Sequence, residues 1–479
     1  MIFKNKLFNG ILWVFTDTFL VGSFQFIALI LLARWLGPKD FGLIGMIAIF
    51  IEIGKSVTDS GLSNSLIRTK AADNSDYSTV FFMNIFMSII IYLISFFSAP
   101  FVANFYNEPI LVDLIRFYCL IFIIIGFSTV QLAILTKKMN FRRITMINSP
   151  AIFLGVIIGL YLGYNGFGVW SIIWMYLTIE TFKSIFFWLF SSWKPCFVFS
   201  TVKFQYHFNF GYKLMLSQII STMFRNIYNV LIGKNFSSQT LGYFERSRQL
   251  CEYPSAALTT IISKVSYPFL SEIQDNKVFL EKTYKDLIKI SFFVISPLML
   301  STAAIAKPLF LILLGDEWVP AVVFFQILSL SMMLYPIHAF NLNILKVSGR
   351  SDLFLKLEII KKVIAGITIV IAFQFGVLGL VWSSVFTSFA ALSVNMFFSS
   401  KVVNYPVLSQ LKDLSLTLIL SLITAVLMYY FSQTLLNTNL IVQLLLSYTF
   451  GAVFYIGVNY INKKSPLHLT LNLLKKQNR

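Results

Sequence analysis

Long apolar segments, separated by short polar or charged breaks, follow one another along almost the whole chain, from Leu7 to Tyr460. A helix needs roughly 20 mostly apolar residues to cross a bilayer, and these segments are close to that length. The pattern predicts an all-α integral membrane protein with about fourteen transmembrane helices and no separate soluble domain. The predicted spans are residues 8–33, 41–66, 78–99, 113–135, 146–164, 167–190, 208–233, 240–264, 288–306, 319–345, 360–375, 377–399, 413–432 and 439–461.

The distribution of charge adds an orientation to this pattern. The chain is 57% hydrophobic and only 12% charged, yet its formal net charge is +18. Most of its 38 Lys and Arg lie at the two termini and in alternate connections, and the opposite connections carry few. By the positive-inside rule, both termini are expected in the cytoplasm. The excess positive charge then reports orientation, and we expect no nucleic-acid partner.

The chain shows no motif for a cofactor or a metal. Its three cysteines, Cys119, Cys196 and Cys251, lie in separate segments without metal-ligand spacing. We therefore expect neither a metal nor a cofactor.

Two pairs of segments indicate an internal repeat. Residues 32–42 are similar to 231–242, and residues 166–171 are similar to 376–383, in the same order along the chain. A repeat of six helices returns the chain to the same side of the membrane, so its two copies should be parallel lobes. The predicted organisation is an N-terminal lobe (1–200), a C-terminal lobe (201–400), and two additional helices with a cytoplasmic tail (401–479). Chance similarity between Leu-, Ile- and Phe-rich segments is the alternative.

Ionisable residues inside the spans are the second informative feature, because a charge at bilayer depth is costly unless it meets water or a partner. Two helices carry three such residues each at the spacing i, i+3, i+7, which places them within a sector about 60° wide. Asp17 in the first span and Arg225 in the seventh add to these groups. The two sets are Glu52, Lys55 and Asp59, and Glu245, Arg248 and Glu252.

Both charged faces are expected to line a water-filled cavity between the lobes. When the repeat is aligned on Gly42 and Gly242, the second set lies on the same helix face, two turns nearer the outer surface. The alternative is that Glu52–Lys55 and Glu245–Arg248 are neutralising i, i+3 pairs that only reduce the cost of membrane insertion.

Three segments resemble the Wzx-type polysaccharide flippases of the multidrug/oligosaccharidyl-lipid/polysaccharide exporter superfamily. These segments are Arg34–Gly42, Asp59–Ile67, and Leu241–Leu250 followed by Pro254. The resemblance implies two six-helix lobes in a V around a central cavity, plus two further helices. It also implies that an undecaprenyl-pyrophosphate-linked oligosaccharide moves from the cytoplasmic to the periplasmic leaflet by alternating access, driven by H⁺ or Na⁺. Membrane lipids and the polysaccharide polymerase machinery are the other partners it implies.

Candidate site residues follow from the charge that such a substrate carries. Cationic side chains in the cavity can replace the water that the pyrophosphate loses, and guanidinium can do so bidentately. The candidates for this contact are Arg225, Arg248, Arg246 and Lys55. Carboxylates in the cavity can carry the coupling ion, since their charge can change with the side to which they are open. The candidates for this role are Asp17, Glu52, Asp59, Glu245 and Glu252.

Three other functions are considered. A multidrug or cation antiporter of the same superfamily would use the acids and leave the arginines as structural partners. A membrane polysaccharide polymerase or glycosyltransferase would need a sizeable outer loop with catalytic residues, and the longest outer connections, near 99–112 and 307–318, are short. Paired charged helix faces argue against a membrane scaffold without transport activity. We therefore favour a transporter that is not an enzyme.

Overall fold

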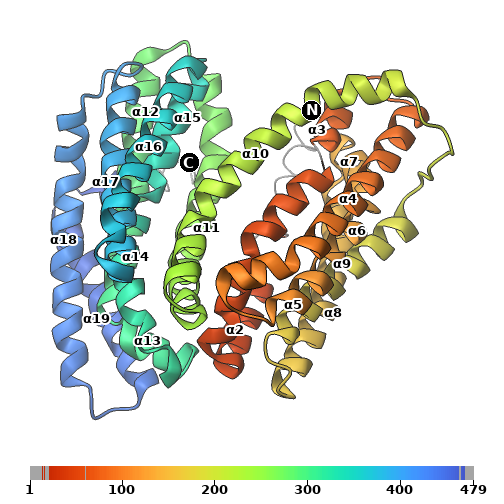
Figure 1. Ribbon diagram of the computed structural model, residues 1–479. Helices are drawn as coiled ribbons and strands as arrows, with labels where there is room; N and C mark the ends of the chain where they lie inside the picture. Colours follow the sequence, from red (N-terminus) through yellow and green to blue (C-terminus); the bar gives the residue numbers. More distant parts are fainter. Residues whose placement is uncertain (1–12, 14–15, 17–20, 60, 463–464, 470–479) are drawn as a thin grey trace. The chain divides into compact units, whose positions relative to one another are not determined.

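The computed structural model describes residues 13, 16, 21–59, 61–462 and 465–469, and these residues form helices and short connections without any strand. The chain divides into two compact units, unit 1 (Met1–Gly242) and unit 2 (Tyr243–Arg479). Figure 1 shows the order of the helices along the chain. The predicted all-α fold is therefore confirmed for the described residues.

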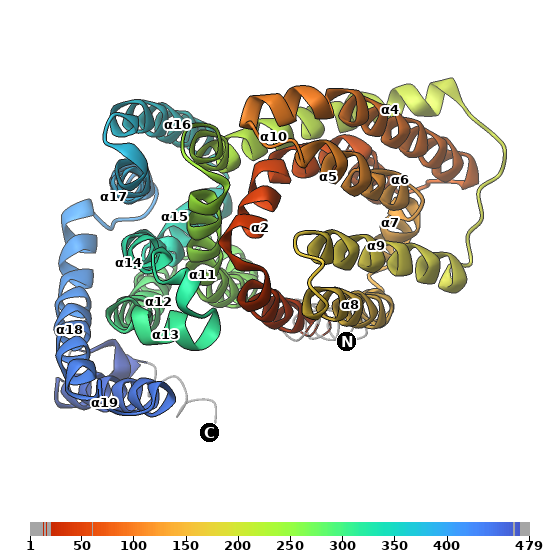
Figure 2. The same cartoon turned by 60° about the horizontal axis from the view of Figure 1, so that its bottom comes forward.

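Unit 1 contains nine whole helices among its described residues, together with the first turn of α11 (Ser238–Glu272). Helix α8 packs along α9 (Figure 2). Helix α10 packs against α2, α3 and α4. The nine helices are α2 (Gly22–Asp59), α3 (Leu62–Arg68), α4 (Asn74–Tyr106), α5 (Leu111–Tyr118), α6 (Leu120–Gly126), α7 (Thr129–Lys137), α8 (Phe141–Tyr164), α9 (Trp170–Phe190) and α10 (Thr201–Asn235).

Unit 2 contains the rest of α11 and the helices that follow it. Helix α12 packs along α18, and α16 along α17. Ser247, Cys251 and Ser255, one turn apart on α11, hydrogen-bond to backbone carbonyls of α14, so small side chains bring the two helices together. The helices are α12 (Lys277–Ala304), α13 (Ala306–Leu313), η2 (Asp316–Trp318), α14 (Ala321–Met332), α15 (Tyr335–Val347), α16 (Ser351–Phe373), α17 (Gly376–Ser400), α18 (Val407–Thr434) and α19 (Leu440–Ile461).

Many of these helices are long and apolar enough to cross a membrane. Among the described residues nine meet this requirement, and ten do so if a bent pair of helices counts as one span. The protein is thus a multi-pass membrane protein, and the predicted count of fourteen spans is not confirmed. Helices α10 and α11 carry too many polar residues to be among the nine.

Three predicted spans are broken where the sequence pattern suggests continuous helices. The span predicted over 319–345 consists of α14 and α15. Within the span predicted over 41–66, α2 ends at Asp59 and α3 begins at Leu62. Gly61, directly before α3, has a φ of +66°. A Cβ at Gly61 would lie 2.4 Å from the Gly211 carbonyl oxygen, so only glycine fits this turn. The span predicted over 113–135 consists of α5, α6 and α7, with a bend of 43° before α7.

Two glycines at equivalent positions of the predicted repeat make reciprocal contacts within unit 1. A Cβ at Gly42 would lie 1.6 Å from the carbonyl oxygen of Ser238, and one at Gly242 would lie 1.9 Å from that of Pro38. Each glycine thus contacts the residue four positions before the other. This reciprocity is what two parallel copies of one segment would produce, and it requires the absence of a side chain at both positions.

Candidate functional site

An ion pair between α2 and α10 is the centre of the candidate site in unit 1. The Arg225 guanidinium donates to Glu52 Oε2 over 3.1 Å, and the Asn226 amide donates to the same oxygen over 3.0 Å. The side chains of Arg225 and Glu52 are 51% and 40% exposed, whereas Asn226 is buried. The structure therefore unites two of the predicted site residues from distant parts of the chain in an accessible pair.

The buried asparagines behind this pair were missed by the sequence reasoning. Asn229 donates to Asn226 Oδ1 over 3.4 Å, and Asn226 also donates to the Thr222 carbonyl, so these amides hold the position from which Asn226 reaches Glu52. The spacing of Thr222, Asn226 and Asn229 along one helix face was the available signal. This signal is weaker than that of a charged residue, because a neutral amide is less costly than a charge in an apolar segment.

Lys55, one turn after Glu52 on α2, belongs to a second charged group in the same unit. It is partly buried and lies within electrostatic reach of Glu180 and Lys183 of α9, as well as of Glu52. Glu180 and Lys183 form an ion pair of 3.0 Å with each other. Glu180 and Lys183, which were not among the predicted site residues, thus belong to the charged surroundings of Lys55. Glu52 pairs across helices, so the alternative of an isolated Glu52–Lys55 pair does not describe this helix.

Two further acids were predicted for this site, Asp59 and Asp17, and the structure does not show either of them in the Arg225–Glu52 pair. Asp59 is the last residue of α2 and faces Ser63 at the start of α3. Asp17 lies outside the described residues.

The charged face of α11, in unit 2, is more enclosed. Arg248 and Glu245 form an ion pair of 2.9 Å with side-chain exposures of 22% and 8%, and Gln249 also donates to Glu245. Arg246 is buried at 1% exposure, and Glu252 is partly buried within electrostatic reach of Tyr335. The Glu245–Arg248 geometry is that of a neutralising i, i+3 pair, as the alternative interpretation predicts.

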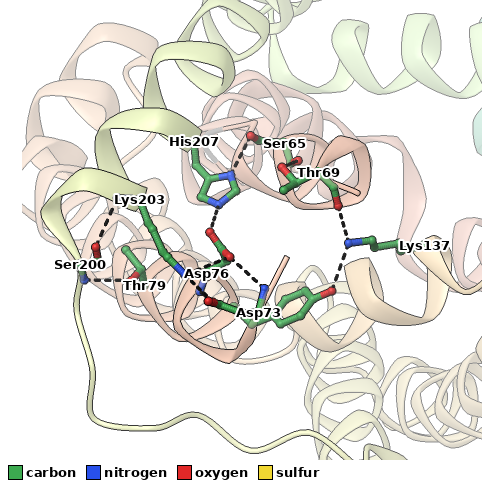
Figure 3. A network of polar contacts seen from close by, with 10 residues as sticks. Ser65, Thr69, Asp73, Asp76, Thr79, Lys137, Ser200, Lys203 and His207 are labelled. Atoms are coloured by element: carbon green, nitrogen blue, oxygen red, sulfur yellow. Dashed lines mark hydrogen bonds and ion pairs between the residues drawn. The ribbon is translucent and has the colours of Figure 1, made fainter. Parts of the chain in front are cut away.

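A further polar network, which the sequence reasoning also missed, joins four helices at the start of α4 (Figure 3). His207 of α10 lies between Ser65 Oγ, at 2.8 Å from its Nδ1, and Asp76 Oδ1, at 3.1 Å from its Nε2. Lys203, one turn earlier on α10, binds Asp76 and Asp73. The His207 side chain is fully buried, so this Ser–His–Asp arrangement has no access for a substrate and acts as an anchor.

The two aspartates of the anchor also begin α4. Asp73 and Asp76 form a reciprocal capping box, in which each side chain accepts a backbone N–H of the other. The Lys203 ammonium holds the pKa of Asp73 well below its usual value, because the bond favours the ionised carboxylate. Lys137 of α7 completes the network by donating to the Thr69 carbonyl and the Tyr77 hydroxyl. The start of α10 is thereby fixed to α3 and α4.

Comparison with known proteins gives a family match and a structural match. A family model described as "Polysaccharide biosynthesis protein" matches residues 31–323. The teichuronic acid biosynthesis protein TuaB of Bacillus subtilis (strain 168) is 22% identical over 353 residues, covering 73% of this chain and 72% of TuaB. The lipopolysaccharide biosynthesis protein WzxC of Escherichia coli (strain K12) is 22% identical over 363 residues, covering 75% of this chain and 74% of WzxC.

The solved structure of the lipid II flippase MurJ, in an inward closed conformation, superposes with a TM-score of 0.75 at 14% sequence identity. The superposition covers 93% of this chain and 97% of that one. At this identity the similarity concerns the fold alone. The matches in sequence and in fold together confirm the resemblance that the three short segments predicted.

Proposed function

Because the chain belongs to the polysaccharide biosynthesis protein family, we propose that it is a flippase for lipid-linked oligosaccharides used in surface polysaccharide synthesis. The substrate in this proposal is an undecaprenyl-pyrophosphate-linked repeat unit, moved from the cytoplasmic to the periplasmic leaflet by alternating access. No covalent bond needs to change, and the protein's task is to carry a charged, sugar-bearing head group across roughly 30 Å of hydrocarbon.

The observation that supports this proposal is the exposed Arg225–Glu52 ion pair. Arg225 lies about 15 Å along the helix axis from the end of α10 at Asn235, and in the predicted span 208–233 this would place it near the middle of the bilayer. An ionised pair with half-exposed side chains at that depth would be costly against acyl chains, so it requires water on its open side. A water-accessible guanidinium in the membrane interior fits a path for an anionic head group.

Arg225 is the principal pyrophosphate ligand in this proposal, and Lys55 assists it. Guanidinium groups bind phosphate oxygens with two parallel hydrogen bonds, which Lys cannot do. Substrate would compete with Glu52 for Arg225, so the pair would open when the head group enters. Arg248 and Arg246 are more enclosed than Arg225 and are assigned a later contact in the transport cycle.

In this proposal the carboxylates bind the coupling ion, which is H⁺ or Na⁺. Glu52 is the first candidate, since release of Arg225 to the substrate leaves its charge without its partner and favours uptake of a cation. Asp59, Glu245 and Glu252 are further candidates, together with Asp17. Coupling at Glu52 would link substrate binding and ion binding at one pair of residues.

The proposal includes the organisation expected from the sequence. Two parallel six-helix lobes, residues 1–200 and 201–400, would alternate around the cavity, and residues 401–479 would add two helices. The reciprocal contacts of Gly42 and Gly242 support the repeat on which this division rests. In this proposal the protein lies in the inner membrane of a bacterium, with both termini in the cytoplasm. The polysaccharide polymerase machinery would receive the product at the periplasmic leaflet.

Deletion of the gene followed by analysis of membrane lipids tests the function. We expect lipid-linked repeat units to accumulate on the inner leaflet, protected from periplasmic glycosidases, and surface polysaccharide to be lost. Normal polysaccharide with increased drug sensitivity would instead indicate a drug or cation exporter. Accumulated repeat units on the outer leaflet would indicate a polymerase.

A further inference from the structure

A small cavity in unit 1, separate from the Arg225–Glu52 pair and open to the surface, combines aromatic rings with two charged groups. Its volume is about 310 Å³, at the small end of the range of about 300–1,000 Å³ for ligand pockets. Four helices, α4, α5, α6 and α9, contribute to its walls. The lining residues are Tyr92, Asp113, Arg116, Phe117, Leu120 and Trp170.

The aromatic wall of the cavity is held in place by ring contacts. The Phe117 ring lies edge-on to Trp170, with centroids 5.6 Å apart, and it also contacts Trp174, at 5.0 Å. Trp170 is the first residue of α9 and follows a turn with positive φ at Gly166 and Gly168. The turn and the ring contacts together fix the indole at the cavity wall.

The polar groups of the cavity have unused hydrogen-bonding capacity among the described residues. In the part of the chain that the structure describes, the Tyr92 hydroxyl, the Asp113 carboxylate and the Trp170 indole N–H make no hydrogen bond. Among the residues described, Arg116 donates from Nε alone, to the Phe96 carbonyl at 3.5 Å, and its guanidinium lies over the Phe96 ring. Its two amino groups are therefore available, and four polar groups with unused hydrogen-bonding capacity meet in one cavity.

The charges of these groups discriminate between classes of ligand. A phosphate would suit Arg116 but would be repelled by Asp113, and a cation would suit Asp113 but would be repelled by Arg116. An acyl chain would leave all four polar groups unsatisfied, which is costly. A neutral polyhydroxyl ring can donate to Asp113, accept from Arg116 and the indole, and place its C–H face on the aromatic rings.

We propose that the cavity lined by Tyr92, Asp113, Arg116 and Trp170 binds one neutral sugar ring of the transported glycan. The cavity lies at the ends of α5 and α9 that the charge pattern places on the outer side, so it would receive the glycan as it leaves the membrane. This inference rests on the proposed flippase function and adds a glycan contact that is distinct from the pyrophosphate contact.

Saturation-transfer NMR on the full-length protein in lipid nanodiscs tests the proposal directly. The probes are methyl glucoside, methyl galactoside, methyl mannoside and N-acetylglucosamine, with inorganic phosphate and tetramethylammonium as competitors. We expect transfer to ring C–H protons of at least one sugar, without competition from either ion. Asp113→Asn and Trp170→Ala should each weaken binding about tenfold, because the first replaces a charged hydrogen-bond acceptor with a neutral one and the second removes an aromatic partner.

Two features of the chain make the test decisive. Asp113 is exposed and unbonded, so D113N should fold even if a change at Arg116 or Trp170 does not. Trp382, which occupies the repeat position of Trp170 and is 42% exposed, gives the matched control W382A, which should bind sugar normally. The proposal is overturned if none of the four sugars shows transfer, if phosphate or tetramethylammonium displaces the sugar, or if D113N and W170A bind as the wild type does.

The outcome is separable from that of the proposed function. Stranded lipid-linked repeat units after gene deletion, combined with no sugar binding, would remove the glycan contact and leave the flippase. Sugar binding at this cavity without stranded repeat units would remove the flippase instead.

Discussion

The Arg225–Glu52 pair leads to a prediction that separates transport from stability. The perturbations are Arg225→Gln, which replaces the guanidinium with a shorter neutral amide, and Glu52→Gln, which removes the charge and keeps the length of the side chain. Glu52→Gln also keeps a carbonyl oxygen that can accept from Asn226. Because both side chains are about half exposed, we expect the pair to contribute only about 0–1 kcal/mol to stability, as exposed ion pairs do.

The effect on transport should be much larger. A charge-assisted hydrogen bond is worth about 1.5–3 kcal/mol, which corresponds to a roughly 10–100-fold change in binding. Arg225→Gln should therefore reduce export of surface polysaccharide by at least about tenfold, since the head group would lose its bidentate ligand. Arg225→Lys keeps the charge without the bidentate geometry and should give an intermediate value.

Two measurements on the same variants check this. Surface polysaccharide is quantified relative to the amount of protein in the membrane, and thermal unfolding is followed on the detergent-purified protein. Arg350 and Asp352 supply a matched control, because their ion pair of 2.9 Å has similar exposures of 48% and 53% but lies at the start of α16, before the predicted span. Arg350→Gln should leave both quantities unchanged.

The reasoning is refuted if Arg225→Gln, present at the wild-type level, exports normally. It is also refuted if Arg225→Gln lowers the unfolding temperature as strongly as a lesion in the core, because the pair would then be structural.

Three further predictions concern packing and the polar anchor. Gly242→Ala places a Cβ against the Pro38 carbonyl and should cost about 1–3 kcal/mol, seen as thermal unfolding at a lower temperature, whereas Gly457→Ala, with open space around it in α19, should not destabilise the protein. His207→Ala removes a partner from both Ser65 and Asp76 and should destabilise the protein by about 1–3 kcal/mol, whereas unchanged thermal unfolding would contradict its anchoring role. The stabilisation that Asp73 contributes, compared with Asp73→Asn, should be constant from pH 8 to about pH 5 and disappear as the pH falls below about 4. The sign follows from its lowered pKa, and a difference that grows on acidification would contradict it.

Local sequence was sufficient for the fold class and for part of the candidate site. Apolar runs of membrane-spanning length predict helices because the backbone must satisfy its own hydrogen bonds in hydrocarbon. Glu52, Lys55 and Arg225 were recognisable for the opposite reason, as charges in runs where a charge is costly. The Glu245–Arg248 pair was predictable too, since residues at i and i+3 are neighbours on any helix.

The partners of these residues could not be predicted from local patterns. Glu52 and Arg225 are separated by 173 positions in the chain, and their pairing depends on how α10 packs against α2. Asn226 and His207 were overlooked because a buried polar residue is informative only when its contacts are known. The cavity at Trp170 likewise depends on four helices meeting, which no single segment specifies.

The order of apolar and charged residues thus determined, by itself, that this chain is a helical membrane protein and which side chains are costly within it. Tertiary structure alone decided that Arg225 meets Glu52 in an accessible pair, that the Glu245–Arg248 pair is largely buried, and that His207 anchors α10. The physical reason is the distance along the chain over which each effect acts. The free energy of transferring a segment into hydrocarbon depends on its own residues, whereas an ion pair or a cavity depends on distances set by the packing of helices that are far apart in the sequence.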